Sequence, residues 1–235
     1  MLRLRQIAFA ATDLPSAESD LEGALGLHLC HRDPNVTVFG LRNALFPIGD
    51  QFLEIVSPSV PDTTAGRLLE RRGGDCGYMV LFQTDALAPV EVRLEHAGIR
   101  VVYEAAGEGI RGIHLHPKDV PGAIVSVDAA DDPAEWPWAG ADWRDHVDTA
   151  KVRALVGLDG AVSDPLTAAA TWAYVLGVEP DGPRLEVDDA TVRFVAPTAT
   201  DRREGITAID VTTDHPSLTG SSRDLLGVTI RYVAS

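Results

Sequence analysis

A repeated order of secondary-structure signals constrains this chain more than any other feature. The sequence predicts a strand around Gln6, a helix start at Asp13-Leu14-Pro15, and a helix whose apolar residues recur at helical spacing before Gly26. Runs typical of strands follow at residues 28–32, 36–41 and 51–57, with turn signals at residues 33–35 and 47–50. We therefore predict a first βαβββ unit.

The same order begins again after a polar, glycine-rich break at residues 70–74. A strand is predicted at residues 77–83, and a helix runs through Val90, Leu94 and His96 until Gly98. Strands are then predicted at residues 99–104, 113–116 and 123–128. Leu14 of the first copy corresponds to Leu87 of the second, so two copies form one pair.

The rest of the chain contains a linker and two weaker copies. Residues 131–148 are acidic and hold Trp136, Trp138 and Trp143. Their apolar residues match neither the helical period nor the strand period, so we predict a linker that packs its tryptophans onto the body of the protein. The third copy is predicted from strand 152–162, helix 166–176 and strands 184–187 and 191–196. The fourth is predicted from strand 206–212, a short helix at 218–226 and strand 228–233, and it lacks one hairpin. The predicted domains are residues 1–130, 131–148 and 149–235.

Composition and charge exclude several kinds of partner. With 235 residues and 45% hydrophobic content, the chain can bury one large core or two small ones. The net charge of −15 disfavours binding to nucleic acid or to an anionic membrane surface. No apolar run reaches the roughly 20 residues that a membrane span requires. Cys30 and Cys76 are too few for a disulfide framework, so we expect free thiols in a cytoplasmic protein.

Two local sequences add a family resemblance to the repeat. The first copy closes with FLEIVSP at residues 52–58, and the second contains IHLHPKD at residues 113–119. Together with the βαβββ order, these runs resemble the vicinal oxygen chelate superfamily, and the second resembles the penultimate hairpin of methylmalonyl-CoA epimerases. The resemblance covers residues 1–130 well and residues 150–235 weakly. It implies an α+β fold of tandem βαβββ modules, in which paired modules form a cupped mixed sheet around a small-molecule cleft and the second pair is truncated.

The resemblance also places the family's four metal-ligand positions on this chain. They fall on Gln6, Glu54, Met79 and Ser126, and only Glu54 is a ligand typical of the family. Methionine and serine offer a hard divalent cation almost nothing. In the second pair the equivalent positions fall near Leu155 or Val156, Arg193 and Thr207, which are poorer still. We therefore expect no metal and no other cofactor, with a divalent metal as the alternative.

His114 and His116 keep that alternative open. They stand two apart on a predicted strand and would face the same way, as a metal pair or a ligand-binding pair does. The competing interpretation is a structural role at a hairpin near the surface. Glu54 is the candidate catalytic residue, because a carboxylate in partly apolar surroundings has a raised pKa that suits proton transfer. A binding or structural role is the alternative for Glu54.

Three functions follow from these residues. The first is a small-molecule cleft that binds or sequesters an organic molecule, lined by Gln6, Glu54, Met79, Ser126, His114 and His116. The second is a metal-independent lyase, isomerase or epimerase acting on a small carbonyl or acyl substrate. The third is a protein-interaction module. The incomplete fourth copy leaves an open strand edge, which favours either packing of the second pair on the first or a homodimer.

Overall fold

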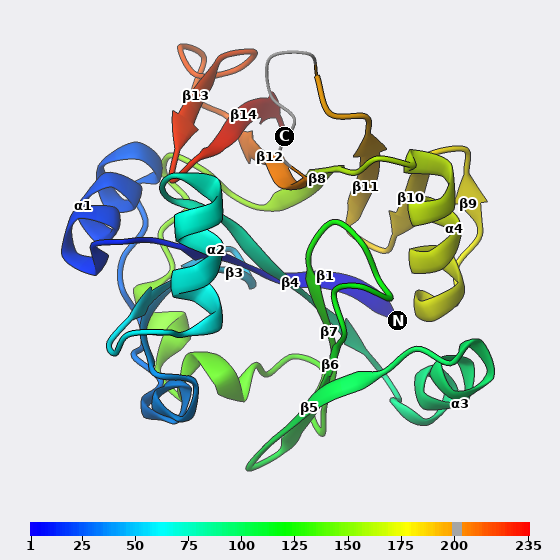
Figure 1. Cartoon of the computed structure of the whole chain (residues 1–235). Helices are drawn as coiled ribbons and strands as arrows, with labels where there is room; N and C mark the ends of the chain where they lie inside the picture. The colour runs from blue at the N-terminus through cyan, green and yellow to red at the C-terminus, as the bar shows by residue number, and fades with distance from the viewer. Residues whose placement is uncertain (199–203) are drawn as a thin grey trace. The chain divides into compact units, whose positions relative to one another are not determined.

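The computed structural model describes residues 1–198 and 204–235, in which most strands follow one another in runs of two or more between helices (Figure 1). The first half contains β1 (Leu2–Ala10), α1 (Leu14–Leu25), the 3₁₀ helix η1 (Pro34–Phe39), β2 (Leu41–Ile48), β3 (Gln51–Pro58), α2 (Thr64–Arg72), β4 (Cys76–Thr84), α3 (Ala88–Ala97), β5 (Val101–Gly107), β6 (Ile110–Leu115) and β7 (Ile124–Ala130). The second half contains the 3₁₀ helices η2 (Pro137–Ala139) and η3 (Trp143–His146), β8 (Leu155–Ala161), α4 (Pro165–Leu176), β9 (Pro180–Asp181), β10 (Arg184–Val187), β11 (Ala190–Val195), β12 (Gly205–Thr213), β13 (Ser222–Leu225) and β14 (Val228–Ala234).

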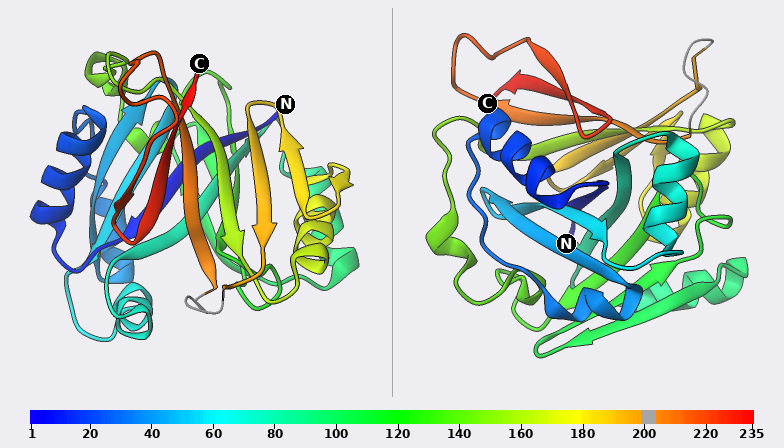
Figure 2. Two further views of the ribbon diagram at one scale, coloured as in Figure 1. Left: turned by 90° about the horizontal axis from the view of Figure 1, so that it is seen from above. Right: turned by 60° about the vertical axis from the view of Figure 1, so that its left-hand side comes forward.

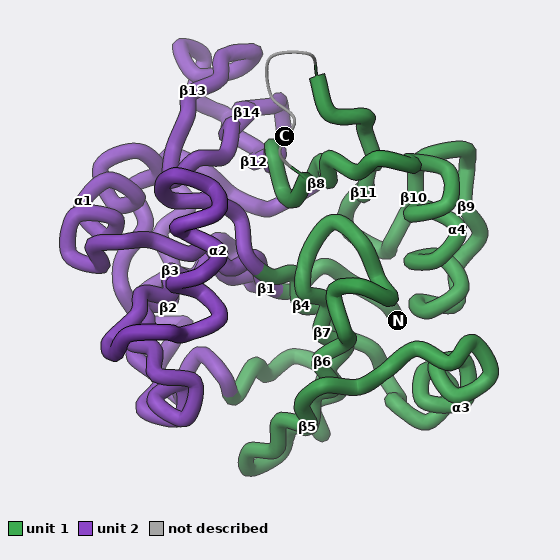
Figure 3. The backbone as a smooth tube through the Cα atoms, in the orientation of Figure 1, with its two compact units in different colours: residues 1–5, 79–137, 157–207 green, residues 6–78, 138–156, 208–235 purple. Residues whose placement is uncertain are grey.

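The chain divides into two compact units, which Figure 3 colours separately. Unit 1 comprises Met1–Arg5, Met79–Pro137 and Gly157–Thr207, and unit 2 comprises Gln6–Tyr78, Trp138–Val156 and Ala208–Ser235. The boundaries therefore run through strands β1, β4, β8 and β12.

In unit 2, strand β3 lies between β2 and β1. It pairs antiparallel with β2 and parallel with β1, so the sheet is mixed. Helix α1 begins at Asp13, whose carboxylate accepts a hydrogen bond from the Ser16 backbone N–H, and ends at Gly26, which is left-handed with φ 71°. Its buried residues Leu21 and Leu25 belong to the face that lies along β2 and β3 (Figure 2).

Helix α2 packs against β3 and completes an apolar cluster in unit 2. Its Ala65 and Leu69 are buried with residues of the strands, namely Ala10, Leu41, Val56 and Cys76. The Thr63 hydroxyl caps the helix by accepting a hydrogen bond from the Gly66 N–H at 2.9 Å. The same unit holds β12, β14 and β13, where β14 pairs parallel with β12 and antiparallel with β13.

In unit 1, strands β4, β7, β6 and β5 follow one another in space. The β4–β7 pair is parallel, and the other two pairs are antiparallel. Strands β8, β11, β10 and β9 repeat this order, again with one parallel pair, and helix α4 lies along β9 to β11 (Figure 2). Trp172 of α4 is almost fully buried and makes edge contacts with the rings of Phe82 and Phe194.

The predicted α+β fold of βαβββ modules is confirmed. The order β4, α3, β5, β6, β7 and the order β8, α4, β9, β10, β11 are both βαβββ. Helices α1, α3 and α4 each end at the glycine that the sequence indicated, namely Gly26, Gly98 and Gly177. Among the helices that the structure describes, none has the length and hydropathy needed to cross a bilayer.

Several local predictions were wrong. Residues 28–32 form only an isolated bridge from His31 to Leu45, and the region predicted as strand 36–41 is mostly the 3₁₀ helix η1. Asp33 explains this helix, because its side chain accepts a hydrogen bond from the Asn35 N–H just ahead of a chain that Pro34 preorganises. Strand β2 extends through residues predicted as a turn, and the actual turn is Gly49–Asp50. Helix α2 was not predicted.

The helix predicted at residues 218–226 is also wrong. These residues contain β13, which forms a hairpin with β14. The two residues between the paired Leu225 and Val228 are Leu226 and Gly227, with φ of 51° and 71°. Positive φ at both central positions is the geometry of the tight turn that two-residue hairpins favour. Turn geometry therefore outweighed the apolar spacing that had favoured a helix.

Candidate functional site

Three buried side chains from neighbouring strands of unit 2, Gln6, Asn43 and Glu54, contact one another. Glu54 lies on β3 opposite Ala8 of β1 and Leu45 of β2. Gln6 and Asn43 are each two residues away from those partners, so they lie on the same face as Glu54 and diagonal to it. The exposed fractions of Gln6, Asn43 and Glu54 are 2%, 3% and 8%. Sheet register therefore brings two amides to one buried carboxylate.

Both carboxylate oxygens of Glu54 accept hydrogen bonds from these amides. The Gln6 Nε2 group donates to Oε2 at 2.9 Å, and the Asn43 Nδ2 group donates to Oε1 at 2.6 Å. The orientation of the Asn43 amide is fixed from its other end, because the Asp33 backbone N–H donates to Asn43 Oδ1 at 2.8 Å. The Asn43 backbone carbonyl accepts a hydrogen bond from Arg32, whose guanidinium also binds Glu18.

The pKa of Glu54 is raised above its ordinary value. Burial is the largest cause, because it penalises the charged form, and the negative charge of Asp33 acts in the same direction. The hydrogen bonds from Asn43 and Gln6 lower the pKa and offset part of this shift. Glu54 therefore takes up a proton more readily than an exposed glutamate, and this property suits a residue that exchanges a proton with a bound molecule.

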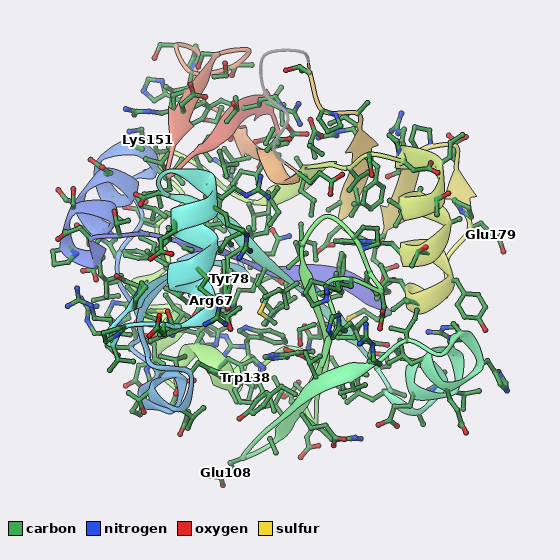
Figure 4. The ribbon with its side chains drawn as sticks, viewed as in Figure 1. Arg67, Tyr78, Glu108, Trp138, Lys151 and Glu179 are labelled. Carbon is green, nitrogen blue, oxygen red and sulfur yellow. The ribbon has the colours of Figure 1, made fainter. Side chains whose placement is uncertain are left out.

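Tyr78 lies near this carboxylate. The residue is half-buried and packs against the apolar cluster that contains Val56 and Leu69. Burial raises the pKa of Tyr78 to about 12, the charge of Glu54 raises it as well, and Arg67 acts in the opposite direction. Figure 4 labels Tyr78 and Arg67 beside each other at α2. The phenol is consequently a neutral hydrogen-bond donor at physiological pH.

The other predicted site residues lie in unit 1. Ser126 of β7 is opposite Leu81 of β4 and opposite His114 of β6, and Met79 is opposite Ile124. The Ser126 hydroxyl is fully buried and donates to Asp128 Oδ1 through a very short hydrogen bond. The structure therefore places Ser126 beside His114.

The two histidines have different surroundings. Burial lowers the pKa of His114 to about 4, so the imidazole is neutral at physiological pH, and its ring lies 5.3 Å from that of Tyr103. His116 lies beyond the end of β6, and its Nδ1 accepts a hydrogen bond from the Lys118 N–H at 3.1 Å. His116 therefore takes part in a turn, whereas His114 belongs to the sheet.

The residues at the family's metal-ligand positions do not fit a metal ion. Both oxygens of Glu54 already accept amide N–H groups, Met79 carries a thioether, and the Ser126 hydroxyl is committed to Asp128. Within residues 1–198 and 204–235, no group of three or more His, Cys, Asp or Glu side chains is arranged to hold a cation. In the second pair, Arg193 forms a salt bridge with Asp159 at 2.6 Å. These side chains therefore do not provide a set of donors for a divalent cation.

Sequence reasoning missed Asn43 and Tyr78. Asn43 carried one signal, a polar amide inside the largely apolar run 41–48, but it fell between the strand predicted at 36–41 and the turn predicted at 47–50 and was assigned to no element. Tyr78 carried no signal, because an aromatic residue in a strand is ordinary core material. Each becomes noticeable only when the strand register and α2 are known.

Comparisons with known proteins agree with this architecture. A family model described as a glyoxalase-like domain matches residues 7–176. A search of curated proteins found no match. A Streptomyces coelicolor methylmalonyl-CoA epimerase variant, solved in complex with 2-nitronate-propionyl-CoA, is 24% identical, with a TM-score of 0.50 over 55% of this chain and 98% of its own. A hypothetical protein from Staphylococcus aureus is 11% identical, with a TM-score of 0.74 over 100% of both chains. These likenesses show a shared fold.

Proposed function

Because the chain belongs to the glyoxalase-like domain family of the vicinal oxygen chelate superfamily, we propose that it binds a small organic molecule beside Glu54 without a metal ion. The observation that carries this proposal is the arrangement of Glu54 itself. Its carboxylate is buried, and within the part of the chain that the structure describes it is held by two amides and by no cationic side chain.

A buried carboxylate of this kind is expensive for a protein to keep. Removing a charged group from water costs several kcal/mol unless an opposite charge or hydrogen bonds compensate it. An apolar residue at position 54 would avoid that cost and also the need for Gln6 and Asn43 in the core. The presence of three polar side chains in the core is explained if Glu54 serves as a polar anchor for a ligand.

The surroundings of Glu54 suit a ligand with an apolar body. Phe52 lies two residues before Glu54 on the same face of β3, and its ring makes an edge contact with Trp143 at 5.1 Å. Leu45 lies opposite Glu54 on β2. Apolar and aromatic walls with a few polar anchors are the usual composition of small-molecule sites.

Native mass spectrometry tests the proposal directly. The wild-type protein, purified without denaturation, should carry a small-molecule adduct that is lost in Glu54→Gln, because the amide cannot replace the carboxylate as a proton or charge partner. Glu186→Gln is the control, since Glu186 is exposed and the adduct should persist. A wild-type protein that carries no adduct and shows no thermal shift with a library of small carbonyl compounds contradicts the proposal.

A second function, an isomerase, epimerase or lyase, is favoured by the raised pKa of Glu54. A carboxylate with such a pKa can remove a proton from the carbon next to a carbonyl group and return it to the other face. The epimerase activity named for the structural neighbours is in keeping with this chemistry. The test is exchange of that proton for deuterium, followed by NMR, which Glu54→Gln should abolish and Glu186→Gln should leave unchanged.

A further inference from the structure

We propose that the Tyr78 hydroxyl is the hydrogen-bond donor that selects the ligand, and that the ligand is a neutral molecule carrying a carbonyl or similar acceptor oxygen. This inference rests on the proposed function and names the ligand class for the site beside Glu54. It follows from where Tyr78 packs, from what its hydroxyl does not contact and from the charges around it.

The Tyr78 ring has a fixed place close to Glu54. It packs against the buried cluster that includes Val56 of β3 and Leu69 of α2. Val56 is two residues beyond Glu54 on the same face of β3, so the phenol and the carboxylate share one neighbourhood. Because the ring is held by packing, its hydroxyl is presented without the entropy cost of ordering a flexible donor.

The hydroxyl of Tyr78 has no hydrogen-bond partner among residues 1–198 and 204–235. Tyr232 provides the contrast, because its buried hydroxyl donates to the Ala24 carbonyl at 3.1 Å. The Tyr78 hydroxyl is not buried from solvent, so it is available to donate to a molecule that approaches from outside the chain. Tyr78 is thus arranged as a ligand contact, whereas Tyr232 is structural.

Charge decides which ligands fit. Tyr78 stays protonated because burial raises its pKa to about 12, so it offers a donor and no positive charge. An anionic ligand would lie beside the Glu54 carboxylate and be repelled by it. The Arg67 guanidinium keeps its positive charge, but it is exposed and therefore screened by solvent, and it donates to the Asp62 carbonyl and the Thr64 hydroxyl at the start of α2. These groups together favour a neutral acceptor over a carboxylate or a phosphate.

Two matched probes test the role of Tyr78. The probes are 4-fluoroacetophenone and 4-fluoro-α-methylstyrene, which differ in that a methylene group replaces the carbonyl oxygen, and binding is followed by fluorine NMR. The wild-type protein should bind the ketone about ten-fold more tightly, as expected for one hydrogen bond. Tyr78→Phe should remove this preference, and Tyr174→Phe, which alters an exposed tyrosine on α4, should keep it. Since the Tyr78 hydroxyl makes no internal hydrogen bond, Tyr78→Phe should unfold at the wild-type temperature.

The outcomes separate this inference from the proposed function. If Tyr78→Phe keeps the preference for the ketone, Tyr78 is not the selecting donor, while binding beside Glu54 still stands. If 4-fluorobenzoate binds as tightly as the ketone, or the wild-type protein does not bind the ketone at all, the neutral-acceptor class is wrong. If, in addition, no adduct is found by native mass spectrometry, the proposed function fails as well.

Discussion

The hydrogen bond from Asn43 to Glu54 gives the sharpest prediction for stability. Asn43→Ala removes a donor to a buried carboxylate, which is worth about 1.5–3 kcal/mol, and it also leaves the Asp33 N–H without its acceptor. Asp33 is half-buried, so its N–H recovers part of its hydrogen bonding from water. We therefore expect the free energy of unfolding to fall by about 3 kcal/mol.

Urea denaturation at pH 7 measures this loss. Asn35→Ala is the matched control, because Asn35 is an exposed amide in the neighbouring 3₁₀ helix and its replacement should change stability by less than about 0.5 kcal/mol. A double-mutant cycle with Glu54→Gln isolates the contact, and we expect a coupling energy of about 1 kcal/mol or more. Additive effects, or a loss no larger than that of the control, would refute the view that Asn43 holds Glu54.

Four further predictions concern the protonation of Glu54, two glycine positions and metal binding. Burial raises the pKa of Glu54 in the folded protein above its ordinary value of 4.5. The contribution of this group to the free energy of unfolding is therefore fully present below pH 4.5 and is lost as the pH rises through the pKa of the folded protein. Urea titrations at a series of pH values should show this loss in the wild-type protein and not in Glu54→Gln. A Cβ atom at Gly112 would lie 2.2 Å from Asp128 Oδ1, so Gly112→Ala should lower the free energy of unfolding by about 1–3 kcal/mol. Gly23→Ala in α1, where a Cβ atom meets nothing within 4 Å, should raise it by about 0.5–1 kcal/mol in the same assay. Zinc, nickel, cobalt, manganese and iron(II) should give no thermal shift, and stoichiometric metal that His114→Ala abolishes would contradict this expectation.

The sequence was sufficient to predict the fold because the repeat has strong local signals. Asp13 and Asp164 cap helices α1 and α4 by accepting hydrogen bonds from nearby backbone N–H groups, and glycines end both helices. Such signals act over a few residues and can be recognised in one copy after another. The predictions failed where two local signals competed, as in η1, where the Asp33 cap outweighed the strand-like spacing of Val36 and Val38.

The candidate site could be predicted only in part. The family resemblance identified Gln6 and Glu54, which the structure joins by a hydrogen bond. The positions of Asn43 and Tyr78 beside Glu54 depend on the register of distant strands and on the packing of α2. Neither can be recognised from the periodicity of the sequence. A residue whose role is set by its diagonal neighbour on another strand cannot be recognised before the strands are aligned.

Three of the copies carry a charged residue on the last strand of a parallel pair, and they differ in what lies opposite it on the first strand. In the third copy Arg193 lies opposite Asp159 on the first strand, and in the fourth Arg231 lies opposite Asp210. Each pair is joined by a salt bridge, at 2.6 Å and 2.5 Å. In the first copy Glu54 instead lies opposite Ala8, which offers no charge. The Glu54 carboxylate is bonded by two neutral amides instead of an arginine, and burial raises its pKa, so we expect proton exchange at this residue.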